Sequence, residues 1–270
     1  MEIRKAAEGD IDGIAVARIT NGPAHDDSGA SADYCRYLIA DGLLLVAVDE
    51  RVLGYGGAID IGPARLLADL YVHADAHGRG VGKALLHAVM DGSHHRFTFA
   101  SNDPAALPLY ARAGMRAWWP LLAMSGLPGS LADIGGATVT QIDPADAARF
   151  EHRLVGTDRF AEYRYWASRT GTRTVAVERS GVTIAVASVC DRTLSRIEHL
   201  VADDADALDA VAAIARTVPA GRLHAYVPGS HHLAVDLMHR GFVVDDTAMY
   251  MASSADLVHH HLQVAHPGLG

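Results

Sequence analysis

Three glycines at alternate positions, Gly78, Gly80 and Gly82, mark the segment of this sequence best suited to chemistry. They follow an apolar run over 66–73 that is typical of a strand, and a helix is predicted from 81 to 90. Glycine lets successive backbone N–H groups turn toward one centre, and a helix N-terminus adds partial positive charge. This arrangement predicts an anion-binding site that fits a diphosphate.

Two common phosphate-binding motifs do not fit this spacing. The chain has no G-x-x-x-x-G-K-[ST] loop for nucleoside triphosphates, and no G-x-G-x-x-G fingerprint opens a first βαβ unit. A glycine-rich turn is also compatible with a tight connection that binds nothing, and glycine spacing alone does not separate these two interpretations.

Metal chemistry is not indicated. The two cysteines, Cys35 and Cys190, are far apart and lack the spacing of zinc sites or disulfide scaffolds. The histidines at 94–95, 231–232 and 259–261 are adjacent, rather than four residues apart as on zinc-binding helices. We therefore expect surface histidines and no metal cofactor.

Two similar sets of elements position these residues. The first set is predicted as strand 2–5, helices 10–19 and 32–40, hairpin 43–49 with 52–60, strand 66–73, helix 81–90, strand 95–100, helix 105–113 and strand 117–125. A linker over 126–137 precedes the second set: strand 138–141, a helix from 143, hairpin 174–178 with 183–189, strand 196–202, helix 205–216, strand 223–227, helix 233–239 and strand 242–251. This duplication predicts two α/β (α+β) domains in tandem, over 1–126 and 138–252, with a tail over 253–270.

The composition limits the classes of partner that we expect this chain to bind. The 270 residues are 50% hydrophobic and 20% charged, with a formal net charge of −9. An acidic chain without a Lys/Arg run has no electrostatic footprint for nucleic acid or an anionic membrane. No stretch has the length of a signal peptide core or a transmembrane helix, so we expect a soluble, cytoplasmic protein. The oligomeric state stays open.

Residues 69–83 resemble the acyl-CoA signature of the GNAT superfamily of acetyltransferases, which is Gln/Arg-x-x-Gly-x-Gly/Ala after a Leu-Tyr-Val strand. Gly80 and Gly82 match the signature, and residues 70–72 match the strand. His77 departs from it, because it stands at the Gln/Arg position.

The strand order of 1–125 and the segment 104–110 also resemble this family. The resemblance implies tandem GNAT-like domains, each a mixed, mostly antiparallel sheet flanked by helices. It also implies direct transfer of an acetyl group from acetyl-CoA to an amine, without a covalent enzyme intermediate.

By the same resemblance, the backbone of 70–72 pairs with pantetheine and polarises the thioester carbonyl, and the amides of 77–83 hold the diphosphate. Lys83 either adds a charge there or is simply solvated, and either Asn102 or Asp103 touches pantetheine. The expected coenzyme contacts are Leu70, Tyr71, Val72, His77, Gly78, Arg79, Gly80, Val81, Gly82, Lys83, Asn102 and Asp103.

Tyr110 stands where the family usually places the general acid that protonates the departing thiolate. A phenol, with a reference pKa of about 10, is close enough to a thiol to donate a proton as the sulfur leaves. The alternative is an interfacial tyrosine on a short helix.

The sequence indicates the general base less clearly than the general acid. Ala68 stands where some relatives carry a glutamate, which leaves the adjacent Asp69 as the candidate base. Alternation along a strand sends Asp69 to the other face, so a structural role is equally open. His25 and Asp26 lie in a loop that borders the acceptor site in the family, and they bind the amine or are merely solvated.

The second domain resembles the degenerate C-terminal halves of certain two-domain bacterial GNAT proteins. It carries Asp203, Asp204 and Asp206 where the first has glycines, and Leu237 near the position of Tyr110. Aspartates complement a helix dipole themselves and repel a diphosphate, so we expect this half to bind no CoA. It would instead wall the acceptor pocket, with Glu198 as a candidate substrate contact or a packing residue.

The resulting hypothesis is an acetyl-CoA-dependent N-acetyltransferase that acts on a small-molecule amine between the halves. Two alternatives remain: an acyltransferase for a protein or peptide amine, and a non-catalytic acyl-CoA sensor. The sequence does not name the acceptor, because this superfamily places many substrates on one scaffold.

Overall fold

The first set of elements occupies the N-terminal half of the computed structural model, which describes all residues except 21–30, 193, 220, 258–261, 266–267 and 270. We call residues 1–126 the first half. Its elements are β1 (Glu2–Lys5), α1 (Ile11–Ile19), α2 (Ala32–Ala40), β2 (Leu43–Asp49), β3 (Arg51–Ile61), β4 (Ala64–Val72), α3 (Val81–Val89), β5 (His95–Ala100), α4 (Ala106–Arg112) and β6 (Arg116–Gly126).

The same order recurs in residues 137–252, which we call the second half. Its elements are β7 (Ala137–Gln141), α5 (Pro144–Val155), α6 (Phe160–Ser168), β8 (Thr172–Arg179), β9 (Val182–Asp191), β10 (Ser195–Ala202), α7 (Ala207–Ala215), β11 (Leu223–Pro228), α8 (His232–His239) and β12 (Val243–Ala252). A further strand, β13 (Leu262–Ala265), lies in the tail. Sequence patterning did not predict α6 or β13.

All the strands of the described residues join one sheet of thirteen strands, in the order β1-β2-β3-β4-β5-β12-β6-β11-β10-β9-β8-β7, with β13 beside β10. Only β4 with β5 and β10 with β11 pair in parallel, and the remaining described pairs are antiparallel. The expected fold, two GNAT-like units with a mixed, mostly antiparallel sheet flanked by helices, is confirmed.

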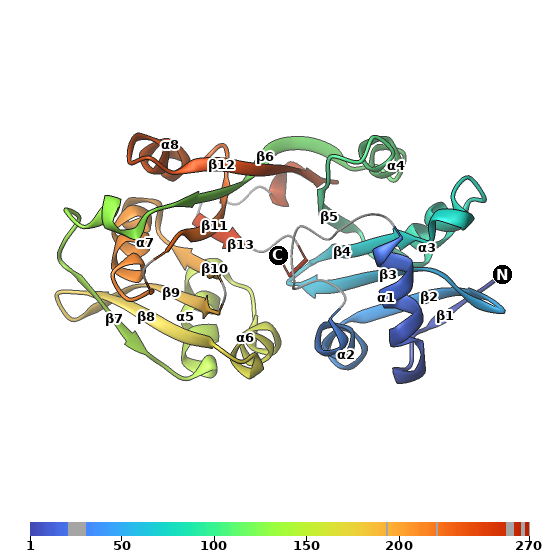
Figure 1. Cartoon of the computed structure of the whole chain (residues 1–270), viewed down its shortest axis with the longest axis horizontal. Helices are drawn as coiled ribbons and strands as arrows, with labels where there is room; N and C mark the ends of the chain where they lie inside the picture. Colours follow the sequence, from blue (N-terminus) through green and yellow to red (C-terminus); the bar gives the residue numbers. More distant parts are fainter. Residues whose placement is uncertain (21–30, 193, 220, 258–261, 266–267, 270) are drawn as a thin grey trace.

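The two halves exchange their last strands. β12 of the second half pairs with β5, and β6 of the first half pairs with β11. β6 and β12 also pair with each other, and they run side by side across the top of Figure 1, over both halves. We propose the sequence division at 126 and 138 as the domain boundary, although each half completes its sheet with a strand of the other.

The hydrophobic core continues across the halves. One cluster combines Ile14 and Leu38 of the first half with Tyr163 and Trp166 of the second, and all four are almost fully buried. Tyr37 and Tyr165 stack at the contact, with ring centroids 4.7 Å apart. In the described part of the chain, no helix is long and apolar enough to cross a membrane.

Candidate functional site

A cavity of about 1000 Å³ opens where β4 and β5 separate. The two strands pair only from Ala64 to Leu67 on β4, and beyond that point the cavity lies against the second part of β4. Its walls also include the start of α3, the segment from β5 to α4, and parts of β6, β11, β12 and the tail. The volume is at the upper end of the range for small-ligand sites.

The glycine turn (residues 77–83) forms one end of this cavity. Gly78 and Gly80 have φ values of +75° and +80°, a left-handed conformation that L side chains rarely adopt. Gly80 is also the N-cap of α3, and it supplies no capping side chain. The first N–H groups of α3 therefore lack a side-chain acceptor and are suited to bind an anion.

Part of the turn is used internally. The amide of His77 donates to the carbonyl of Ala74 at 3.2 Å, and that of Arg79 donates to Ala76 at 3.4 Å. The prediction that every amide of the turn faces the ligand therefore needs correction at these two positions. The amide of His77 closes the 3-10 turn Ala74–Ala76, and that of Arg79 closes the turn that follows it.

His77 has a different contact from the one expected at the Gln/Arg position. Its Nε2 lies 2.9 Å from the carbonyl oxygen of Val72, which ties the turn back to the end of β4. Lys83 is exposed and lines the cavity near the glycines. A Cβ placed at Gly78 or Gly80 would meet no described atom within 4 Å, so open space lies beside the turn. Together these features fit a diphosphate.

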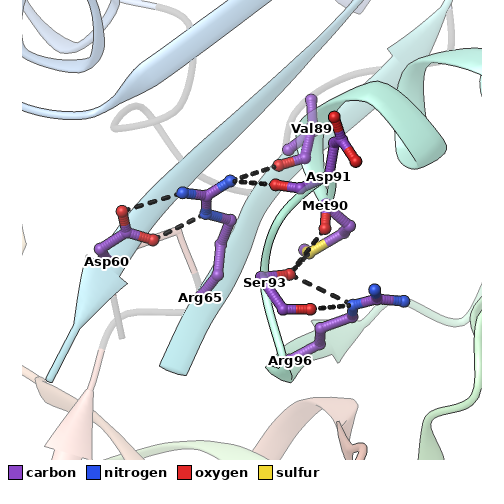
Figure 2. Close-up of polar contacts among 7 residues, drawn as sticks. All are labelled: Asp60, Arg65, Val89, Met90, Asp91, Ser93 and Arg96. Carbon is purple, nitrogen blue, oxygen red and sulfur yellow. Dashed lines mark hydrogen bonds and ion pairs between the residues drawn. The ribbon is translucent and has the colours of Figure 1, made fainter. Parts of the chain in front are cut away.

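Arg65 of β4 fixes the other end of α3 (Figure 2). Its guanidinium donates to both carboxylate oxygens of Asp60 at 2.7 and 3.0 Å. It also donates to the carbonyl oxygens of Val89 and Asp91, each at 3.1 Å. A cation is stabilising at a helix C-terminus, and here it sets the position of α3 relative to the strand that lines the cavity.

Tyr110 of α4 lines the same cavity and is only 8% exposed. Burial raises the pKa of its hydroxyl well above the ordinary value, and the nearby Tyr71 and Asp69 raise it further. The phenol is therefore protonated throughout the neutral range and can act as a proton donor.

Asp69 lies beside a β-bulge of β4 and lines the cavity. In the β3–β4 ladder, Asp69 pairs with Gly57 and Leu67 pairs with Ala58, so Ala68 is an extra residue. The bulge breaks strict alternation, and both Ala68 and Asp69 line the cavity. Burial is the main cause of the raised pKa values of Tyr34, Tyr55 and Tyr110, and the charge of Asp69 raises all three further. Asp69 therefore lies close to these three rings.

Asn102 and Asp103 both line the cavity at the end of β5. The side-chain amide of Asn102 donates to Asp246 of β12 at 3.1 Å, so its orientation depends on the second half. Asp103 accepts from the amide of Ala105 at 2.7 Å, before the start of α4.

Three residues, His25, Asp26 and Glu198, were predicted to contact the acceptor. His25 and Asp26 lie outside the described residues. Glu198 is 1% exposed, pairs with Arg169 at 3.2 Å and does not line the cavity. The sequence left a substrate contact and a packing role open for Glu198, and the structure buries its side chain beside Arg169, away from the cavity.

The second half repeats the β-bulge of the first half but not its glycine turn. Glu198 is the extra residue of a bulge in β10, between Ile197 and His199, and so corresponds to Ala68. The acidic start of α7 is partly paired within the protein, because Arg179 lies 2.6 Å from Asp206. Asp206 is thus a structural partner, and its backbone does not repeat the left-handed conformation of Gly80.

Several cavity residues were missed by sequence reasoning, namely Arg18, Tyr34, Tyr226, Asp246, Thr247, Ala248, Gly268 and Leu269. They come from α1, α2, β11, β12 and the tail, and no local pattern marks them. Among the described residues, no three His, Cys, Asp or Glu side chains are placed to hold a metal ion. The stretch 259–261 lies outside the described residues.

Residues 40–115 match the family model of the acetyltransferase (GNAT) domain. This span includes β4, the glycine turn and Tyr110, which line the cavity. A search of the curated proteins finds no match for the chain.

Solved structures share the fold of the whole chain. A protein from Pyrococcus horikoshii, proposed to be an acetyltransferase, is 16% identical with a TM-score of 0.79, over 100% of this chain and 95% of that one. A tandem GNAT protein from the clavulanic acid biosynthesis pathway is 17% identical with a TM-score of 0.61, over 93% and 97%. A GCN5-related N-acetyltransferase from Kribbella flavida is 18% identical with a TM-score of 0.61, over 93% and 71%. Residues 40–115 thus match an acetyltransferase (GNAT) domain, and the chain as a whole shares the fold of these solved structures.

Proposed function

We propose that this acetyltransferase moves the acetyl group of acetyl-CoA directly to the nitrogen of a small-molecule amine. One observation carries the proposal: the uncapped start of α3, the second part of β4 and the buried hydroxyl of Tyr110 border a single cavity. The first two features suit the diphosphate and pantetheine of the coenzyme, and Tyr110 suits the end of the cavity where the thioester reacts.

The reaction forms a C–N bond and breaks the C–S bond of the thioester. The attacking nitrogen loses one proton, and the departing sulfur gains one. Tyr110 is proposed to donate the proton to sulfur, because its phenol is protonated at neutral pH and it lines the cavity. Asp69 is proposed to attract the ammonium group and accept its proton, since it lines the cavity and its charge acts on the nearby Tyr110.

A small acceptor is favoured by the walls of the cavity. Tyr226 and Asp246 of the second half and Leu269 of the tail line it opposite the first half. A cavity bordered on both sides leaves less room for a peptide chain than an open groove would.

The coenzyme site is tested by Gly80→Asp, which places a carboxylate at the N-terminus of α3. The matched control is Gly92→Asp, because Gly92 has a similar φ of +72° and also has open space around it. We expect Gly80→Asp to weaken acetyl-CoA binding by about 100-fold, equivalent to about 2.8 kcal/mol, as measured by calorimetry. Gly92→Asp should bind like the wild type. Equal affinities in all three proteins would exclude the glycine turn as the diphosphate site.

The acceptor class is tested by release of free CoA thiol with a panel of polyamines, aminoglycosides, amino acids and lysine peptides. Turnover with small amines but not peptides supports the proposal. Turnover confined to peptides would favour the protein acyltransferase, and tight acetyl-CoA binding without turnover would favour the sensor.

A further inference from the structure

The tail returns to the second half as a strand. β13 pairs antiparallel with β10, with His199 opposite Ala265 and Ala202 opposite Leu262. The bulges of β4 and β10 place Glu198 in register with Ala68. Residues 199–202 therefore correspond to 69–72, the part of β4 that borders the cavity in the first half.

The two parallel strand pairs separate in the same way. β10 pairs with β11 only over Ser195–Ile197, as β4 pairs with β5 only over Ala64–Leu67. In the first half the space beyond this point is the cavity, whereas in the second half β13 lies there beside β10 and close to β11. A peptide strand thus takes the place that the proposed function gives to pantetheine, and it bonds to the same edge by strand addition.

The described residues after β13 reach the cavity of the first half. The hydroxyl of Tyr34 donates to the carbonyl of Gly268 at 2.7 Å, and the guanidinium of Arg159 donates to the carbonyl of Leu269. Arg159 and Leu269 are each 1% exposed, so this contact is fully buried. We call these two donors the anchors of the tail: Tyr34 belongs to the first half and Arg159 to the second.

Both Gly268 and Leu269 line the cavity that holds Asp69 and Tyr110. Their carbonyl oxygens are used by the two anchors, and Leu269 packs in the core that the halves share. The tail therefore contributes a fixed, apolar wall to the cavity.

We propose that β13 fills the vestigial coenzyme cleft of the second half, and that this anchorage sets Leu269 as the wall that limits the size of the acceptor amine. The second half then serves the reaction by holding a specificity element. The proposal rests on the proposed function, because it takes the first-half cavity as the acceptor site.

The strand is tested on the full-length protein by calorimetry with acetyl-CoA together with backbone hydrogen exchange. We expect one coenzyme per chain, and slow exchange in 199–202 and 262–265 with and without acetyl-CoA. A second coenzyme per chain, or loss of protection in these strands when acetyl-CoA is added, would show that the cleft still accepts a ligand and would overturn the proposal. Failure of Gly80→Asp to weaken binding would instead count against the proposed function.

The wall is tested by Leu269→Ala, with Leu237→Ala as the matched control. Leu237 is fully buried in the separate core of the second half and does not line the cavity. The probe is a series of linear primary amines from ethylamine to octylamine. For Leu269→Ala we expect the ratio of kcat/KM for hexylamine over propylamine to rise about tenfold, with unchanged acetyl-CoA affinity.

Leu237→Ala should keep the wild-type ratio even if it lowers the melting temperature, which separates a specificity effect from general destabilisation. An unchanged ratio in Leu269→Ala, or the same change in both variants, would overturn the role of Leu269. If no alkylamine is acetylated, the ratio is measured instead for the largest over the smallest amine that the acceptor panel shows to be a substrate, and exchange and stoichiometry decide the place of β13.

Discussion

Tyr110 meets the strictest chemical requirement of the proposed reaction, because an acid must stay protonated until the thiolate leaves. Burial is the largest cause of its raised pKa, and Tyr71 and Asp69 act in the same direction. Tyr110→Phe removes the proton but keeps the ring that packs against the core. We expect kcat to fall by about 100-fold, with unchanged affinity for acetyl-CoA.

The control for this variant is Tyr250→Phe. Tyr250 is also buried, but its hydroxyl donates to the carbonyl of Leu257, and it does not line the cavity. Steady-state thiol release and calorimetry give kcat and affinity separately. A wild-type kcat in Tyr110→Phe would remove Tyr110 as the acid.

Glu151 is a buried carboxylate whose charge depends on its neighbours. Its Oε2 lies 2.8 Å from Nε2 of His199 and accepts from the hydroxyl of Tyr163 at 2.8 Å. Burial is the largest single influence and acts to raise the pKa of Glu151, but His199, Arg159 and the hydroxyl of Tyr163 together lower it. A carboxyl with a lowered folded-state pKa stabilises the protein above its unfolded pKa, and this contribution is lost as the pH falls through the folded value.

Glu151→Gln should therefore cost about 3 kcal/mol in free energy of unfolding at pH 7, because it breaks a buried pair. The difference from the wild type should narrow below about pH 4, under the unfolded glutamate pKa. Urea unfolding at pH 7 and at a pH below about 4 measures this difference in free energy of unfolding. The exposed Glu2→Gln is the control. A difference independent of pH would contradict an ionised Glu151.

At the scale of elements, Arg65 couples α3 to two strands. It joins Asp60 of β3 with the carbonyls at the C-terminal end of α3 (Figure 2). Arg65→Lys keeps the charge but loses the planar two-sided contact. We expect a loss of about 1 to 2 kcal/mol in stability and a weaker affinity for acetyl-CoA, since the other end of α3 forms the diphosphate site.

The matched control is Arg51→Lys, in which a more exposed arginine of β3 keeps a single contact with Asp75 at 3.3 Å. Thermal melts of both variants measure the loss of stability, and calorimetry measures the affinity for acetyl-CoA. If the two variants lose the same stability and neither changes affinity, Arg65 does not position α3.

Predicted elements agree with the structure where a local pattern carries enough information. Glycine spacing and an apolar period fixed the start of α3 at Val81, because both signals come from neighbouring residues. β13 has only four residues, too few for a period, and the residues it pairs with on β10 lie 60 to 66 positions earlier in the chain. The bulge at Ala68 was likewise invisible, since a bulge is defined by the partner strand.

At the scale of the whole molecule, the exchanged strands make the halves interdependent. A fragment that ends at Gly135 lacks β12, and so it leaves β5 and β6 with unpaired edges. We expect fragments 1–135 and 136–270 to aggregate when expressed separately, and to recover acetyl-CoA binding when co-expressed. Circular dichroism measures whether the fragments are folded, and calorimetry measures their acetyl-CoA binding. A soluble fragment 1–135 that binds acetyl-CoA alone would contradict this interdependence.

The sequence by itself determined the tandem order of elements, the glycine turn and the position of Tyr110, because each depends on residues close together in the chain. Only the tertiary structure decided the strand exchange, the entry of Asp69 into the cavity, the burial of Glu198, and the arrival of Tyr34 and Leu269 at the same wall. The physical reason is distance along the chain. Each of these contacts joins segments that no local propensity relates, and packing and strand pairing alone select them.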